Sequence, residues 1–143
     1  HTLSLHDALP IYCIFCKIIS GEIPSHTTYE DENCKVILDI NAATKGHSII
    51  IAKDHYDNFF ELPEEKAVEV IKVAKIMSKQ MAENLQCDGF NILQNNNEVA
   101  GQTVMHYHMH LIPRYKCDRQ DLTMETTQPS QEELLEIKNI IIG

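Results

Sequence analysis

Histidines occupy every second position from His106 to His110, and the apolar residues Tyr107, Met109 and Leu111 fill the positions between and after them. Because side chains alternate between the two faces of a β-strand, this pattern predicts a strand with three imidazoles on one face at ~6.6 Å steps. The opposite face is apolar and suits a hydrophobic core. One face of this strand must therefore pack against a core, and on the other face the imidazoles need hydrogen-bond or metal partners.

Three interpretations of the histidine face remain open from these residues alone. The first is a partly exposed polar strand face with no chemical role. The second is a metal site, because neighbouring imidazoles are common metal ligands. The third is a nucleophilic histidine that the other two support.

The remaining elements follow from changes in hydrophobic periodicity. Strands are predicted over 27–29, 34–40, 47–52, 90–94 and 103–112, with Pro113 ending the last of them. A long helix is predicted from Pro63 to about Leu85, and a final helix begins with a capping box of Ser130 and Glu133 and runs to Ile140. Strands joined by short turns around one long helix predict an α+β fold with an antiparallel sheet of about five strands.

The 143 residues suit a single domain, which we place at 12–143. Residues 1–11 differ from the rest and are interpreted as a non-native or disordered extension. The chain has 12 Lys and Arg against 21 Asp and Glu, a net charge of −9, which argues against a protein that coats nucleic acid. Apolar runs are too short to span a membrane, and five cysteines, an odd number, fit a cytoplasmic protein better than a disulfide framework.

Cys13 and Cys16 form a C-x-x-C pair near the start of the predicted domain. Such a pair is a redox motif, half of a zinc site, or two unrelated cysteines. The βαβ pattern that accompanies thioredoxin-type redox pairs is not predicted here. A structural zinc site needs two further ligands, and histidines are the natural source.

A polar loop at 95–103 leads into the histidine strand. Its amides and hydroxyl are neutral hydrogen-bond donors that can bind phosphate oxygens, although a simple turn would explain the composition equally well.

The residues from His106 to Leu111, with Gly101-Gln102-Thr103 before them and Ile112-Pro113-Arg114-Tyr115 after them, resemble the signature of the histidine triad (HIT) family. The resemblance extends back through 45–51, 38–40 and 13–24, so it covers about 13–115. Within the family the chain is most similar to the Hint-like bacterial branch with a C-x-x-C zinc site. The resemblance implies a HIT-like fold.

The resemblance also implies a nucleotide hydrolase or transferase that cleaves at the α-phosphorus of purine nucleoside 5′-phosphoramidates of the AMP type. His108 matches the nucleophile that forms a nucleotidyl-histidine intermediate, His110 matches the residue beside the phosphate, and His47 matches the histidine that helps to orient the nucleophile. Three alternatives are a dinucleoside polyphosphate hydrolase, a nucleotide-binding interaction module with incidental catalysis, and a catalytic zinc hydrolase that uses the three histidines.

Binding residues are implied in the same way. Asp39 matches the acidic residue that binds the ribose hydroxyls. The apolar walls around the base correspond to Phe15, Ile18, Ile23 and Ile40, and the donors on the phosphate side correspond to Asn95, Gln102 and Thr103.

The family resemblance further implies a structural Zn²⁺ and no organic cofactor. Its ligands would be Cys13, Cys16, His55 and His106, a Cys₂His₂ set in which His106 is scaffold rather than catalyst. The family also implies a homodimer in which two sheets join into one.

Overall fold

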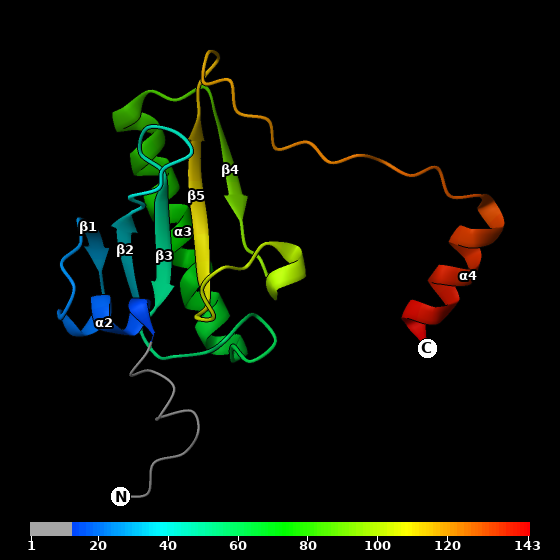
Figure 1. Ribbon diagram of the computed structural model, residues 1–143, viewed down its shortest axis with the longest axis horizontal. Coiled ribbons are helices and arrows are strands. Elements are labelled where there is room, and N and C mark those ends of the chain that lie inside the picture. Colours follow the sequence, from blue (N-terminus) through cyan, green and yellow to red (C-terminus); the bar gives the residue numbers. More distant parts are fainter. Residues whose placement is uncertain (1–12) are drawn as a thin grey trace, which may run out of the picture.

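A five-stranded antiparallel sheet, in the order β1-β2-β3-β5-β4, organises the chain (Figure 1). The structure is a computed structural model and describes residues 13–143, so the expectation for residues 1–11 lies outside the described residues. The strands are β1 (Thr27–Glu30), β2 (Cys34–Leu38), β3 (Ser48–Ala52), β4 (Gly89–Leu93) and β5 (His108–Arg114). The predicted α+β fold with an antiparallel sheet of about five strands is confirmed.

The long helix α3 (Glu64–Leu85) covers one face of the sheet. The main core lies between this helix and the sheet, where buried helix residues such as Val70, Val73 and Met77 meet Ile50 and Leu111. The helix begins after Pro63, with Glu64 and Glu65 in its first turn near the positive end of the helix dipole. The predicted helix bounds therefore agree with the structure.

A short helix, α2 (Ile14–Ser20), covers one end of the opposite face, and the sequence pattern did not predict it. The Cys13 side chain caps its start by accepting from the Cys16 backbone N–H at 3.4 Å. Gly21 ends it in a left-handed conformation with φ 87°. Phe15 and Ile18 of this helix form a second, smaller core with isoleucines of β2 and β3.

Strand β5 departs from the expectation at both ends. It begins at His108 rather than at 103, because the chain bends over 104–106, so His106 precedes the strand. It also continues through Pro113 to Arg114. Proline is tolerated because the pairing of β5 with β3 ends at Ser48–Leu111, so no backbone N–H is needed at position 113 on that side. The Pro113 carbonyl accepts a hydrogen bond from the Thr44 hydroxyl at 2.6 Å.

The last helix, α4 (Gln131–Ile142), begins with the predicted capping box of Ser130 and Glu133. The loop at 95–101 contains a single 3₁₀ turn, η2 (Glu98–Ala100). Within residues 13–143, no helix combines the length and the apolarity needed to cross a membrane.

Candidate active site

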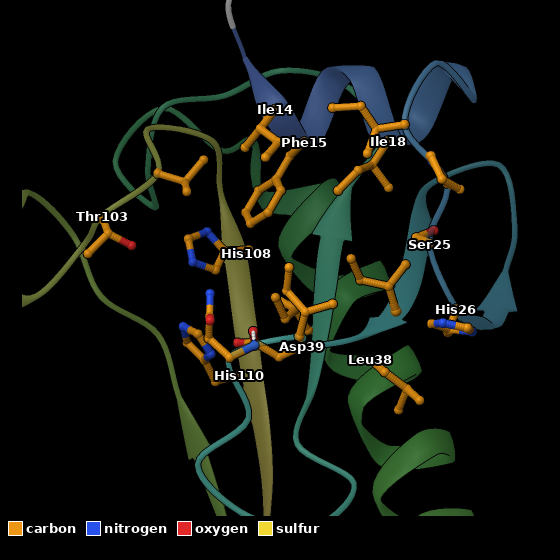
Figure 2. Close-up of a pocket in the computed structure, with 17 residues that line it drawn as sticks. Ile14, Phe15, Ile18, Ser25, His26, Leu38, Asp39, Thr103, His108 and His110 are labelled. Carbon is orange, nitrogen blue, oxygen red and sulfur yellow. Dashed lines mark hydrogen bonds between the residues drawn. The ribbon is translucent and has the colours of Figure 1, made fainter.

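A cavity of about 470 Å³ opens on the sheet face that α2 partly covers (Figure 2). Its size lies within the usual range of small-molecule sites, roughly 300–1,000 Å³. Helix α2, the end of β2 and the first half of β5 all contribute to its walls. One side is apolar, and the other presents His108, His110 and Asp39.

One ring nitrogen of His108 hydrogen-bonds to the backbone, and the other faces the cavity. Its Nδ1 lies 2.7 Å from the carbonyl oxygen of His106. A carbonyl can only accept, so Nδ1 carries the proton and the lone pair of the neutral ring resides on Nε2. Burial lowers the pKa of His108, and the Phe15 ring packs edge-on against the imidazole at 4.9 Å. The result is a neutral, oriented imidazole with a nucleophilic Nε2.

His110 and His47 form a second directed pair beside it. The Ala43 backbone N–H donates to His47 Nδ1 at 2.9 Å, so the proton of neutral His47 resides on Nε2. That Nε2–H donates to His110 Nδ1 at 2.9 Å, which leaves the His110 proton on its own Nε2. Burial, with the neighbouring histidines, lowers the pKa of His110 to about 4. His110 therefore supplies a neutral N–H donor to the cavity.

Asp39 follows β2 and lines the same cavity. One carboxylate oxygen accepts from the Asn41 backbone N–H at 2.8 Å, and the other lies 3.5 Å from His47 Nε2. The carboxylate is thus fixed at the end of the strand and keeps acceptor capacity for hydroxyl groups of a ligand.

The predicted apolar wall residues all line this cavity, but their exposure differs. Phe15 and Ile18 are almost fully buried, and Ile23 is half-buried. Ile40 is 90% exposed and stands at the rim. Ser25 and His26 line the cavity as well, and sequence reasoning missed them because neither belongs to a periodic or spaced motif.

The three predicted phosphate-side donors are placed differently from one another. Thr103 lines the cavity. Gln102 is buried, and its amide nitrogen donates to the carbonyls of Asp57 and Val104, while its oxygen accepts from the Asn97 backbone N–H at 2.7 Å. The Asn95 amide donates to the Gly101 carbonyl at 3.4 Å. Neither Asn95 nor Gln102 belongs to the described lining of the cavity.

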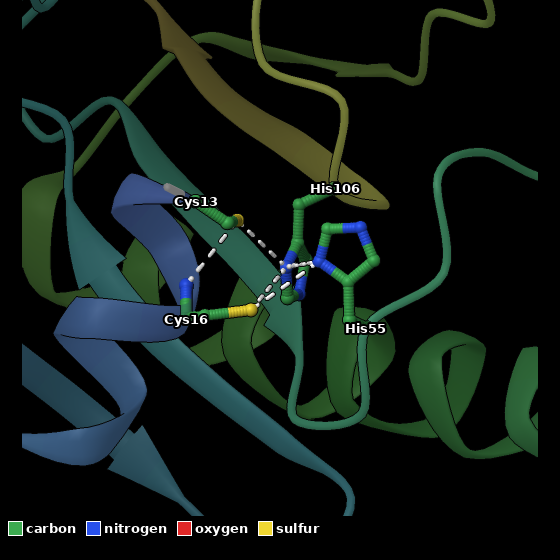
Figure 3. Close-up of side chains that lie close together, drawn as sticks. All are labelled: Cys13, Cys16, His55 and His106. Atoms are coloured by element: carbon green, nitrogen blue, oxygen red, sulfur yellow. Dashed lines mark hydrogen bonds between the residues drawn. The ribbon is translucent and has the colours of Figure 1, made fainter. Parts of the chain in front are cut away.

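Cys13, Cys16, His55 and His106 come together beside the cavity, as the family resemblance implied (Figure 3). One ligand atom from each lies within 4.8 Å of all the others. His106 Nε2 meets the Ala52 carbonyl at 2.6 Å, and His55 Nε2 meets an Asp57 carboxylate oxygen at 3.0 Å. Both rings therefore keep their protons on Nε2 and turn Nδ1 toward the cysteines.

The chemistry of this cluster fits a divalent metal. The two Nδ1 atoms lie 3.1 Å apart, and each carries a lone pair, so a cation between them removes their repulsion. Three of the four sulfur–nitrogen separations are 3.3 to 3.4 Å: those from Cys13 to His106 and from Cys16 to His55 and to His106. A tetrahedral Zn²⁺ with usual bond lengths would set its N–N and S–N separations at about 3.3 and 3.6 Å. Burial raises the pKa of Cys16 to about 12, and a bound cation would favour its thiolate form.

A second group, Asp39, His47 and His110, also has ligand atoms in proximity. Its geometry favours a hydrogen-bond chain instead. A metal on His47 Nε2 would displace the proton there, while Nδ1 already accepts from Ala43, so the ring would have to become an anion.

Fold and site together define a protein with an oriented histidine in an apolar-walled cavity and a Cys₂His₂ cluster beside it. The pattern of the HIT domain matches residues 20–117. The chain belongs to the HIT family.

Proteins of similar sequence include two that are named for an enzyme activity. The chain is 48% identical over 106 residues to a HIT-like protein of Methanocaldococcus jannaschii, a match that covers 74% of this chain and 81% of the relative. It is 39% identical over 112 residues to adenosine 5′-monophosphoramidase of Saccharomyces cerevisiae, covering 78% and 68%. An adenylylsulfatase of Arabidopsis thaliana is 42% identical over 106 residues, covering 74% of this chain and 54% of the relative.

Solved structures agree with the fold. A member of the HIT family from Bacillus subtilis superposes with a TM-score of 0.85 at 40% identity and covers 92% of this chain and 95% of its own. A zinc-bound histidine triad family protein from Mycobacterium smegmatis has a TM-score of 0.75 at 33% identity and covers 92% and 99%.

Proposed function

We propose that the chain is a nucleotide hydrolase that cleaves purine nucleoside 5′-phosphoramidates at the α-phosphorus through a nucleotidyl-His108 intermediate. The observation that carries this proposal is the hydrogen bond from His108 Nδ1 to the His106 carbonyl, because it leaves a neutral Nε2 to face the cavity. The monophosphoramidase and adenylylsulfatase relatives support a hydrolase that acts on adenylyl compounds.

Two displacements at phosphorus make up the proposed reaction. His108 Nε2 attacks the α-phosphorus, the P–N bond to the leaving nitrogen breaks, and that nitrogen departs as an amine after taking up a proton. Water then attacks the nucleotidyl-histidine and breaks the bond to Nε2, which releases the nucleoside monophosphate. The proton that this water loses to the solvent balances the one that the leaving nitrogen took from the solvent. One difficult displacement is thereby divided into two easier ones.

Neutral donors bind the phosphoryl group in this scheme. In this proposal the Nε2–H of His110 and the Thr103 hydroxyl donate to phosphate oxygens, and Asp39 accepts from the ribose hydroxyls; all three residues line the cavity. The base lies against Phe15 and Ile18. Because none of these donors is cationic, the anionic product is released without breaking an ion pair.

The Cys₂His₂ cluster is proposed to hold a structural Zn²⁺ through Cys13, Cys16, His55 and His106. When bound, the metal cross-links α2 to the segments before α3 and before β5. The same residue, His106, offers its side chain to the cluster and its carbonyl to His108. The cluster uses only one of the three signature histidines, which argues against a catalytic zinc bound by all three.

Hydrolysis of adenosine 5′-phosphoramidate by the purified chain tests the proposal. His108→Asn keeps a donor to the His106 carbonyl but removes the nucleophile, so it should lower kcat at least ~10³-fold with an unchanged melting temperature. Tight nucleotide binding with no turnover by the wild type would instead indicate an interaction module. Faster turnover of dinucleoside polyphosphates than of phosphoramidates would reassign the substrate class.

A further inference from the structure

The turn between β2 and β3, residues 39–47, lies at the end of the sheet where β5 finishes (Figure 1). Its two ends are joined by the Asp39 backbone N–H, which donates to the His47 carbonyl at 2.9 Å. Within the turn, the Ala43 backbone N–H donates to His47 Nδ1, also at 2.9 Å. The backbone group that sets the His47 tautomer therefore belongs to an irregular segment, and its position depends on the contacts that hold this segment.

Two side-chain hydrogen bonds tie the turn to β5 and to the residue that follows it. The Thr44 hydroxyl donates to the Pro113 carbonyl at 2.6 Å, and the Tyr115 hydroxyl donates to the Lys45 carbonyl at 2.8 Å. Thr44 is only 7% exposed and Pro113 is fully buried, so water has little access to the first bond, whereas the second is exposed. The turn is thereby fastened to the strand that carries the proposed nucleophile.

The direction of the hydrogen bond between His47 and His110 follows from the Ala43 N–H. Because His47 Nδ1 accepts from Ala43, its Nε2 donates to His110 Nδ1, and His110 keeps its own proton on Nε2. Without the Ala43 N–H, the neutral His47 ring is free to carry its proton on Nδ1 instead. His110 would then donate from Nδ1 and present a lone pair at Nε2, which repels a phosphate oxygen rather than binding it.

We propose that Thr44 is a positioning residue, with Tyr115 as a second anchor, which holds the Ala43 N–H against His47 and so keeps His110 a donor to the phosphoryl group. Thr44 does not belong to the described lining of the cavity, so its effect on a substrate has to pass through Ala43 and His47. The consequence for the phosphoryl group rests on the proposed function. The consequence for the two imidazoles does not, since it needs no nucleotide.

Nitrogen-15 signals of the histidine rings test the proposal, because protonated and unprotonated ring nitrogens resonate at well-separated frequencies. Thr44→Val keeps the shape of the side chain and removes the hydroxyl. The two ring signals of His47, and likewise those of His110, should then move toward one another as the second tautomer becomes populated. The change should be partial, because the Asp39 carboxylate, 3.5 Å from His47 Nε2, favours the original tautomer. The kcat for adenosine 5′-phosphoramidate should fall about tenfold.

Two further variants serve as controls. Thr44→Ser keeps the hydroxyl, so it should retain the wild-type ring signals and most of the wild-type rate. Thr28→Val also removes a threonine hydroxyl, one that donates to the Val36 carbonyl on the edge strand β1, and it should change neither quantity. If Thr44→Val does not fold, Tyr115→Phe removes the exposed anchor and should move the same ring signals by a smaller amount.

Unchanged ring signals in a folded Thr44→Val would overturn the proposal, whether or not kcat falls, because Thr44 would then not act through His47. Unchanged signals in Tyr115→Phe would do the same if Thr44→Val does not fold. A wild type that binds the phosphoramidate without turning it over would instead contradict the proposed function, and the ring signals would still decide the role of Thr44.

Discussion

Three backbone groups set the protonation pattern of the histidines. The carbonyls of His106 and Ala52 fix the protons of His108 on Nδ1 and of His106 on Nε2, and the Ala43 N–H fixes that of His47 on Nε2. Backbone amides do not change their protonation near neutral pH, so each of these rings keeps one defined tautomer and presents one defined nitrogen to its site. The two neighbouring signature histidines thereby acquire opposite tautomers and separate tasks.

Burial of the neutral His110 ring makes stability depend on pH. The folded pKa is about 4, below the usual 6.5, so between these values the unfolded chain binds more protons than the folded chain. The free energy of unfolding should therefore fall as pH drops from 6.5 to about 4. The contribution of this residue is below ~1.4 kcal/mol per pH unit.

Urea denaturation at pH 7.5 and pH 5 measures this contribution. His110→Asn keeps an acceptor for His47 but cannot titrate, so its stability should fall less between the two pH values than that of the wild type. Equal losses in both proteins would show that burial of His110 does not shift its pKa.

Functional residues could be predicted from the sequence where they form a regular pattern. The alternation at 106–110 and the C-x-x-C pair indicated the two groups of residues that the structure brings together. Ser25 and His26 could not be found in this way, because their place at the cavity depends on how the turn before β1 folds back over the sheet.

At the scale of elements, the loop before β5 is fixed by the buried Gln102 side chain. Its three hydrogen bonds tie the segment after His55 to both ends of the loop. Gln102→Leu would leave a backbone N–H and two carbonyls without these partners, and we expect it to lower the free energy of unfolding by about 2–4 kcal/mol. Thermal and urea unfolding would measure the loss. The exposed Gln120→Leu is the control, and equal stability of the two variants would contradict this role.

Element boundaries were predicted less well than element types. The five strands and helix α3 follow from periodicity, which reports local burial, whereas helix α4 follows from its capping box of Ser130 and Glu133. Helix α2 was missed because seven residues give little periodic signal and its cap is a cysteine side chain. The start of β5 was placed too early because the bend at 104–106 serves the contacts of His106 with Cys13 and Ala52, which lie far away in sequence.

At the scale of the whole molecule, the Cys₂His₂ cluster joins parts of the chain as distant as α2 and the start of β5. If it holds the proposed zinc, one metal per chain should be found by elemental analysis of chelator-free protein. Chelation should then lower the melting temperature, and activity should decline only as fast as the protein unfolds. Immediate loss of activity with an unchanged melting temperature would instead indicate a catalytic metal.

The Cys16→Ser variant refines this test. It removes a proposed ligand with a small change in volume, so it should lower both zinc content and melting temperature. Cys117→Ser alters an exposed cysteine outside the cluster and should change neither quantity. A full zinc complement in Cys16→Ser would place the metal elsewhere.

Covalent capture of the intermediate tests the central claim most directly. Rapid acid-free quenching of the chain with adenosine 5′-phosphoramidate, followed by intact-mass and peptide analysis, should show one adenylyl group per chain on His108, absent from His108→Asn. Turnover with the adenylyl group on another residue, or undiminished turnover by His108→Asn, would contradict the account.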